Sequence, residues 1–303
     1  MWHRGTYPLA QQVVQEIEQF INSAPQEGER ICDRFSGQLL CLVKVAVRGG
    51  KLTQLLNLDI VAEAELPPQP YFDHRQAKRA LARQFPVPPA PLPGGPSVCV
   101  IDSGVNSNHP LLANNFGHAE SIATATSTAA DENGHGTMVG GLAVFGEIRA
   151  CYENGAFSSP VTLYSARVLN SENGFDNESL ILHQMQRAIA VFSSAPYSCR
   201  VFNLSLGDDV AWLSQNKRQS LWAESLDILA REYDVLLIVS AGNHNLGTAG
   251  NASDAEEIVQ SYPEFLFEPE CGLCEPATAA IAITVGGIAA SDIPLYCPSS
   301  SRE

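Results

Sequence analysis

The sequence predicts an α/β fold with three layers, in which a mostly parallel sheet carries helices on both faces. Short runs rich in Val, Ile and Leu recur after Pro96, as is typical of strands that are buried on both faces. Helix-like stretches separate these runs, and an alternation of strand and helix along the chain favours a parallel sheet. The 303 residues are enough for one large domain with a smaller appendage.

The elements of the main domain follow one another in a clear order. The apolar runs predict strands at 97–102, 160–168, 199–206, 234–241 and 280–286. The stretches between them predict helices at 134–145, 177–193 and about 215–232. The first of these helices has no charged residue between Thr137 and Phe145, so we expect it to be buried all round.

Residues 1–66 predict a small α+β accessory unit. Its expected elements are an amphipathic helix at 9–23, a strand at 38–50, a helical turn or two at 51–58 and a second strand at 59–66. A proline-rich linker follows at 67–96, with a short helix expected at 73–85 before the extended spacer PVPPAPLPGGP. The main domain then occupies 97–303.

The charge balance disfavours two classes of partner. The chain has 33 acidic and 18 basic residues and a formal net charge of −15. An acidic chain without a basic cluster predicts no nucleic-acid partner and no anionic membrane surface. The N-terminal segment lacks the apolar core and cleavage site of a signal peptide, and no stretch reaches the ~18 apolar residues of a membrane span. We therefore expect a cytoplasmic protein whose eight cysteines are reduced.

Two further patterns are weak evidence for a ligand. Cys271 and Cys274 in CGLC have the spacing of zinc ligands, but a second pair is lacking, so we predict no metal. The segment GHGTMVGG contains a loose dinucleotide-binding pattern, yet the preceding STAADEN is polar and not strand-like. A nucleotide-binding enzyme is therefore disfavoured, and we predict no cofactor.

Three polar residues lie where predicted elements begin or end. Asp102 ends the first strand in VIDSGV, His135 begins the apolar helix, and Asn243 follows the strand ending in VSAGN. Taken singly, each is explained as a turn aspartate, a helix-capping or core histidine and a turn asparagine. Taken together, a carboxylate, an imidazole and an amide donor are the groups of acyl-transfer catalysis. We expect them near the carboxyl ends of the strands, where α/β sheets bind their ligands.

These segments carry a family resemblance. VCVIDSGVNSNHPLL, NGHGTMVGGLA and VSAGN resemble the aspartate, histidine and oxyanion-asparagine motifs of the subtilisin-like serine proteases, the subtilase family. The order of aspartate before histidine agrees with that family. FNLSLGDD resembles its substrate-binding strand, and the resemblance covers about 97–290. It implies a subtilisin-like fold and a serine endopeptidase.

The resemblance also implies a role for each residue of the site. Asp102 would orient the ring of His135, which would act as general base and then as general acid. Asn243 would donate a hydrogen bond to the oxyanion. Two short runs would bind a peptide or unfolded protein, one through its backbone and one as a pocket wall. They are Ser205, Leu206 and Gly207 for the backbone, and Ser240, Ala241 and Gly242 for the pocket.

Glycines near His135 are expected to allow close approaches. Gly134 and Gly136 would let a substrate come near the ring, and Gly140 and Gly141 would let the helix lie against the sheet.

The nucleophile of such a protease is missing from the sequence. The family motif G-T-S-x-A does not occur, because both HGT and LGT are followed by other residues and PSSSRE lacks the glycine. We therefore expect a truncated, C-terminally incomplete subtilase domain that is inactive as given, with its serine beyond residue 303. The alternative is a pseudoprotease that binds peptides without cutting them, which the intact Asp102, His135 and Asn243 disfavour.

The accessory unit at 1–66 leaves two interpretations. Secreted subtilases carry a folded propeptide with a similar order of elements, but the lack of a signal peptide favours a fixed accessory domain. Cytosolic subtilases with such extensions resemble those encoded beside AAA-type ATPases in bacterial defence systems. This resemblance implies an AAA-type ATPase as a candidate partner.

Overall fold

The computed structural model describes residues 7–37, 40–70, 85–123, 126, 128–212, 219–242, 264 and 272–287. Asn243, Cys271 and nearly all of the helix expected at 73–85 lie outside these residues.

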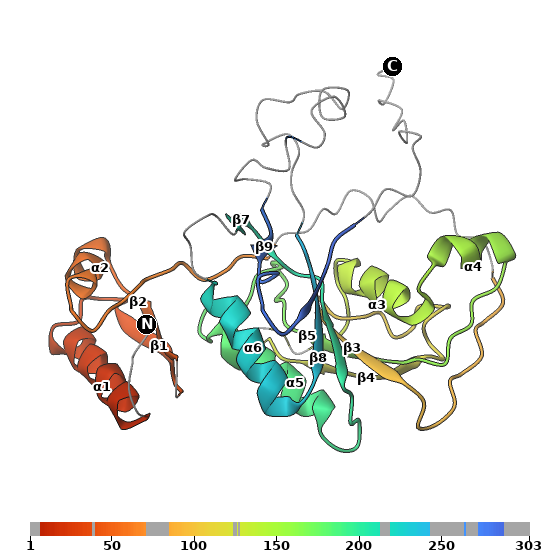
Figure 1. The fold of residues 1–303 in the computed structure, drawn as a ribbon, viewed down its shortest axis with the longest axis horizontal. Coiled ribbons are helices and arrows are strands. Elements are labelled where there is room, and N and C mark those ends of the chain that lie inside the picture. The colour runs from red at the N-terminus through yellow and green to blue at the C-terminus, as the bar shows by residue number, and fades with distance from the viewer. Residues whose placement is uncertain are drawn as a thin grey trace.

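Six parallel strands form the main sheet, in the order β10-β8-β6-β3-β5-β4 (Figure 1). Their bounds are β3 Ser97–Asp102, β4 Phe116–Ser121, β5 Thr162–Arg167, β6 Val201–Leu204, β8 Leu236–Ser240 and β10 Ile283–Val285. The α/β fold with a mostly parallel sheet is therefore confirmed. The strands end toward the top of Figure 1, so residues that follow them lie along one edge.

Helices cover the two faces of this sheet unequally. On one face lie α5 (Ile181–Ser193) and α6 (Leu221–Tyr233), and on the other lies α3 (His135–Phe145), followed by the short α4 (Ile148–Asn154) (Figure 1). The larger core fills the space between the sheet, α5 and α6, with aromatic residues such as Phe192, Phe202 and Trp222 buried in it. A smaller core joins α3 to β3 and β5.

A small second sheet beside the main one was not predicted. The strand β7 (Asp208–Trp212) pairs antiparallel with β9 (Cys274–Glu275) beside the ends of β6 and β8. β7 is only five residues long and begins with two aspartates, and the two residues of β9 leave no periodic pattern in a sequence.

The N-terminal unit contains α1 (Tyr7–Ser23), β1 (Arg30–Ser36), β2 (Cys41–Ala46) and α2 (Gly49–Leu56). The two strands pair antiparallel, so the partner of the predicted strand at 38–50 is β1 and not 59–66. The strand expected at 59–66 is wrong, because this segment has no regular structure after a short turn. Ile60 and Val61 pack on the core of the unit, whereas Leu66 is 91% exposed. The apolar residues of 59–66 therefore resemble a strand in the sequence although only the first of them are partly buried.

This unit packs against the helices of the main domain. Leu40 and Leu42 are buried in one cluster with Leu182 of α5. At the beginning of α5, the Asp33 carboxylate accepts hydrogen bonds at 2.7 Å from the backbone N–H of Leu180 and from Nδ1 of His183. The N-terminal unit therefore caps a helix of the main domain with one of its own side chains.

The environment of Asp33 makes this docking sensitive to acid. Burial raises the pKa of Asp33, but the hydrogen bonds from Leu180 and His183 lower it more, to below the ordinary 3.8. Because the pKa is lowered in the folded state, the stabilisation is complete above pH 3.8 and is lost as the pH falls through the lowered value.

Replacing Asp33 by alanine is expected to loosen the first turn of α5. The loss of a capping carboxylate costs about 0.5–2 kcal/mol, and hydrogen exchange of the Leu180 amide should become faster by the corresponding factor. Asp59→Ala is a matched control, because Asp59 is an exposed residue of the same unit. Equal exchange at Leu180 in both variants would contradict the cap.

Within the described residues, no helix combines the length and the apolar character needed to cross a membrane.

Candidate active site

Asp102 and His135 meet at the edge where the strands end. Asp102 is the last residue of β3 and is fully buried, and His135 is the first residue of α3. The Nδ1 atom of His135 lies 2.8 Å from Oδ1 and 3.0 Å from Oδ2 of Asp102. The backbone N–H of Ser103 donates to the same carboxylate at 2.7 Å. An ionised carboxylate only accepts, so Nδ1 of His135 carries the proton and Nε2 is the proton-accepting nitrogen of the neutral ring.

The surroundings of His135 adjust its basicity. Burial lowers the pKa of the ring, whereas the hydrogen bond and the charge of Asp102, together with the charge of Asp131, raise it. The net result is a pKa above the ordinary 6.5. A ring of this kind is a stronger proton acceptor than a free histidine, which suits a general base.

A glycine allows the close approach of α3 to β3. A Cβ at Gly136 would lie 2.1 Å from the carbonyl oxygen of Gly104 and 3.2 Å from Cβ of Asp102. The expectation that Gly136 serves substrate approach is therefore wrong, because backbone fills that space. Gly140 does face the sheet, where its Cβ would meet Leu163 at 3.0 Å. Gly141 has open space around it and does not pack on the sheet.

The helix α3 is not buried all round, contrary to expectation. Met138 and Leu142, one turn apart, are 43% and 50% exposed. Beside them, the sheet face is open over β8 and β10, where Leu236, Ile283 and Val285 are 38%, 50% and 51% exposed. These three residues share one face, because Ile283 and Ile238 are paired in register and side chains alternate along a strand.

The two runs expected to bind substrate lie at the same edge as Asp102. Ser205, Leu206 and Gly207 follow β6, and the side chain of Leu206 is fully buried in the core. Ser240 ends β8 and is followed by Ala241 and Gly242.

The backbone of the second run is held by neighbouring strands. The Ala241 N–H donates to the carbonyl of Val285 at 2.8 Å, and the Ala241 carbonyl accepts from the N–H of Cys274 at 3.0 Å. Gly242 has φ +108°, and a Cβ there would lie 2.5 Å from Sγ of Cys274. Only glycine fits beside this buried cysteine, so the predicted pocket wall is a rigid part of the sheet.

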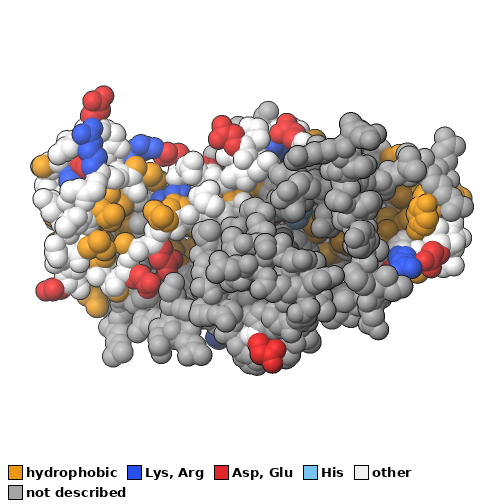
Figure 2. Space-filling model, turned by 90° about the horizontal axis from the view of Figure 1, so that it is seen from above, with side chains coloured by type: hydrophobic (Ala, Val, Ile, Leu, Met, Phe, Trp, Pro, Cys, Tyr) orange, Lys and Arg blue, Asp and Glu red, His pale blue; other side chains and the backbone are white. Residues whose placement is uncertain are grey.

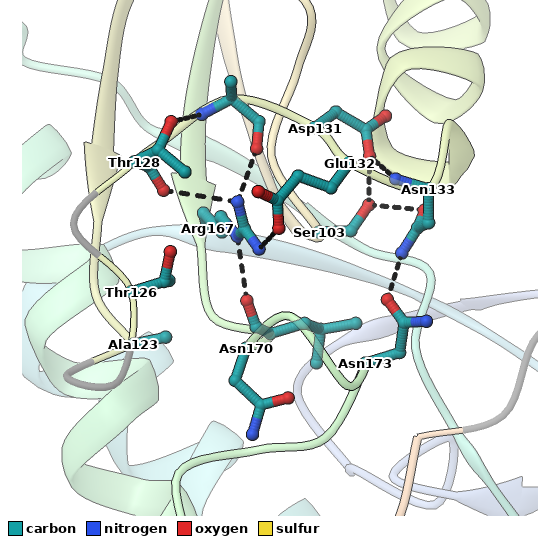
Figure 3. Close-up of polar contacts among 12 residues, drawn as sticks. Ser103, Ala123, Thr126, Thr128, Asp131, Glu132, Asn133, Arg167, Asn170 and Asn173 are labelled. Carbon is teal, nitrogen blue, oxygen red and sulfur yellow. Dashed lines mark hydrogen bonds and ion pairs between the residues drawn. The ribbon is translucent and has the colours of Figure 1, made fainter.

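A polar network beside the Asp102–His135 pair was not anticipated from the sequence. Figure 3 shows Ser103, Asp131 and Asn133 joined by hydrogen bonds, with Arg167 bonded to the loop that contains Asp131. The signal that could have revealed it is the DEN run before the helix, since Asp and Asn cap helix N-termini.

The described residues give no indication of a metal. They contain no group of three His, Cys, Asp or Glu side chains placed to hold an ion. Cys32, Cys41, Cys99, Cys151 and Cys199 are free thiols. In Figure 2, which views the molecule from above, the basic side chains of the coloured residues are scattered and do not gather in a patch.

The fold and the pair define a class of protein. A parallel α/β sheet that presents a buried aspartate to a histidine at its carboxyl edge has two of the three groups of an acyl-transfer triad. The chain belongs to the subtilase family, whose model matches residues 94–303. A second model, described as the Y4kK central domain, matches residues 1–66.

Two curated relatives match part of the chain. Uncharacterized protein y4bN of Sinorhizobium fredii is 44% identical over 109 residues, which are 36% of this chain and 24% of that protein. A subtilisin of Bacillus sp. (strain TA39) is 29% identical over 159 residues, which are 50% of this chain and 34% of that protein. The match thus spans about a quarter to a third of these relatives.

Solved structures are also similar. A cold adapted subtilisin-like serine proteinase has 21% identity and a TM-score of 0.38, over 63% of this chain and 54% of that one. The prenylagaramide maturation protease PagA has 21% identity and a TM-score of 0.36, over 62% and 52% of the two chains.

Proposed function

We propose that this chain supplies the aspartate and histidine of a subtilase-type serine endopeptidase. The observation that carries the proposal is the 2.8 Å contact between Nδ1 of His135 and the buried Asp102 carboxylate. Asp102 fixes the tautomer, so that Nε2 of His135 can take the proton of a serine and return it to the leaving amine. Asp102 also stabilises the imidazolium that forms between these two steps.

The remaining groups are assigned by the same proposal. The amide of Asn243 donates to the oxyanion, whose charge develops only in the transition state. The backbone of Ser205, Leu206 and Gly207 pairs with an extended peptide, and the wall formed by 240–242 borders the residue before the cut. Such pairing suits a substrate that is unfolded or lies in a loop. No cofactor takes part.

The nucleophile is proposed to lie on a segment beyond residue 303. Support comes from the sequence, which lacks G-T-S-x-A, and from the apolar face beside α3. Neighbouring strands lie about 4.8 Å apart, so the width of β6, β8 and β10 is close to the ~10 Å diameter of one helix. A helix in this place would begin at the edge of the sheet where His135 begins α3.

A peptide-binding pseudoprotease is the second candidate, and the missing G-T-S-x-A motif favours it. The two functions differ in one assay. A version of the protein extended by a subtilase segment that carries G-T-S-x-A should cleave casein, and the same version with His135→Ala should not. If the extended protein bound casein peptides without cleaving them, the result would support the pseudoprotease and contradict the proposed endopeptidase activity. The AAA-type ATPase partner and the cytoplasmic location remain predictions.

A further inference from the structure

We propose that Asp131 is a positioning residue that holds His135 in register with Asp102. The inference rests on the function proposed above, but its test does not require activity. Asp131 lies in the loop that leads into α3, and its carboxylate joins that helix to the end of β3.

Both carboxylate oxygens of Asp131 are used. Oδ1 accepts from the hydroxyl of Ser103 at 3.0 Å and from the backbone N–H groups of Asn133 and Gly134 at 3.1 and 2.9 Å. Oδ2 accepts from the backbone N–H of Thr137 at 2.9 Å and from its hydroxyl at 2.6 Å. The donors therefore come from the residue after Asp102, from the two residues before α3 and from the first turn of α3.

The first turn of α3 needs these acceptors. Its N-cap is Gly134, which has no side chain and a left-handed backbone with φ 97°. The amides of a first helical turn have no partner within the helix, and a cap normally satisfies one of them. Asp131 accepts from Thr137, and Oδ1 of Asn133 accepts from the N–H of His135 at 2.8 Å.

Ser103 carries the connection back to Asp102. Its N–H donates to the Asp102 carboxylate, and its hydroxyl oxygen accepts from the N–H of Gly136 at 3.0 Å. A hydroxyl has one proton to donate, and in this site that proton faces Asp131 and Asn133, each at 3.0 Å. Asp131 thereby orients the hydroxyl that also contacts the residue after His135.

Arg167 fixes the loop from the other side, as Figure 3 shows. It is 1% exposed and is aligned with Asp102 across β5 and β3. Its guanidinium donates to the carbonyls of Ala130 at 2.7 Å and Leu169 at 2.9 Å, and to the Glu132 carboxylate at 2.7 Å. Residues 130 and 132 are thus anchored on both sides of Asp131, which leaves its carboxylate little freedom to move away.

Asp131 also acts on His135 through its charge. Burial lowers the pKa of His135, the hydrogen bond and charge of Asp102 raise it, and the charge of Asp131 adds to that rise. The other charged groups of this network are Glu132 and Arg167, which are paired with each other. Removing the charge of Asp131 should therefore lower the pKa of His135.

The test is an NMR titration of the His135 ring in the present chain. Asp131→Asn should lower the pKa of His135 and weaken the signal of the Nδ1 proton that is bonded to Asp102. Glu147→Gln is the matched control, because Glu147 is an exposed acid beyond the other end of α3 and has no part in this network. It should leave both readouts as they are in the parent chain. A folded Asp131→Asn chain with the parental titration would overturn the proposal.

Thr137→Val is a second test of the proposal, and it leaves the charge of the Asp131 carboxylate unchanged. It removes the hydroxyl that donates to Asp131 at 2.6 Å. The Nδ1 proton of His135 should then exchange faster with water. An unchanged exchange rate would contradict a positioning role, even if Asp131→Asn did not fold. Because neither readout depends on catalysis, failure of the peptidase proposal would leave both outcomes interpretable.

Discussion

Replacing Asp102 by asparagine in the extended, serine-containing protein is expected to lower kcat by about 10⁴-fold. The carboxylate accepts from Nδ1 of His135, whereas an asparagine amide can turn its NH₂ group toward the ring. The ring would then carry its proton on Nε2, where it cannot accept one from the serine. KM should change little, because Asp102 is fully buried and cannot touch a substrate.

A control separates this effect from a loss of structure. Asp227→Asn is suitable, because Asp227 accepts from backbone N–H groups of residues 280 and 281. This variant should keep a kcat near that of the parent. If Asp102→Asn retained a kcat within about tenfold of the parent, the role given to the pair would be wrong.

Gly136→Ala is expected to have the largest structural effect of any single methyl group added to α3. The new Cβ would lie 2.1 Å from the Gly104 carbonyl oxygen, and neither backbone can move without shifting Asp102 or His135. Overpacking of this kind costs about 1–3 kcal/mol of unfolding free energy. The shift should also lengthen the contact between Nδ1 of His135 and the carboxylate.

Gly141→Ala in the same helix is the matched comparison. A Cβ at Gly141 has no neighbour within 4 Å, and alanine is favoured over glycine in a helix by about 0.5–1 kcal/mol. Denaturant unfolding should therefore show opposite signs for the two variants. A Gly136→Ala protein as stable as the parent would mean that α3 does not approach β3 as closely as described.

The sequence predicted the central strands because their side chains are apolar on both faces, even in β8, where one face is partly exposed. Runs such as SVCVID and LLIVS are almost continuously apolar, and this pattern has few competing explanations. The edge strand β4, FGHAES, was missed because it is only partly buried and four of its six residues are polar or glycine. β1 was missed for the same reason, since three of the seven residues of RICDRFS are charged and no residue of the strand is fully buried. One of these charged residues, Asp33, contacts the start of α5.

The residues of the site could be predicted where a catalytic side chain lies at the end of a strand or at the start of a helix. Asp102 and His135 were found because one ends an apolar strand and the other begins an apolar helix. Asp131 and Arg167 were not, because their contacts are with backbone groups that only the folded loop brings near. The exposure of Met138 and Leu142 was not predicted either, because an apolar residue looks the same in a sequence whether its side chain is covered or exposed.

Labelling with a fluorophosphonate tests the central claim most directly, because the probe reacts with a serine that a neighbouring histidine activates. The present chain should not be labelled, since its sequence contains no G-T-S-x-A motif. The extended protein should be labelled at one serine in its G-T-S motif, and His135→Ala should abolish that labelling. Stoichiometric, His135-dependent labelling of a serine within residues 1–303, or labelling of the extended protein that does not depend on His135, would contradict the account.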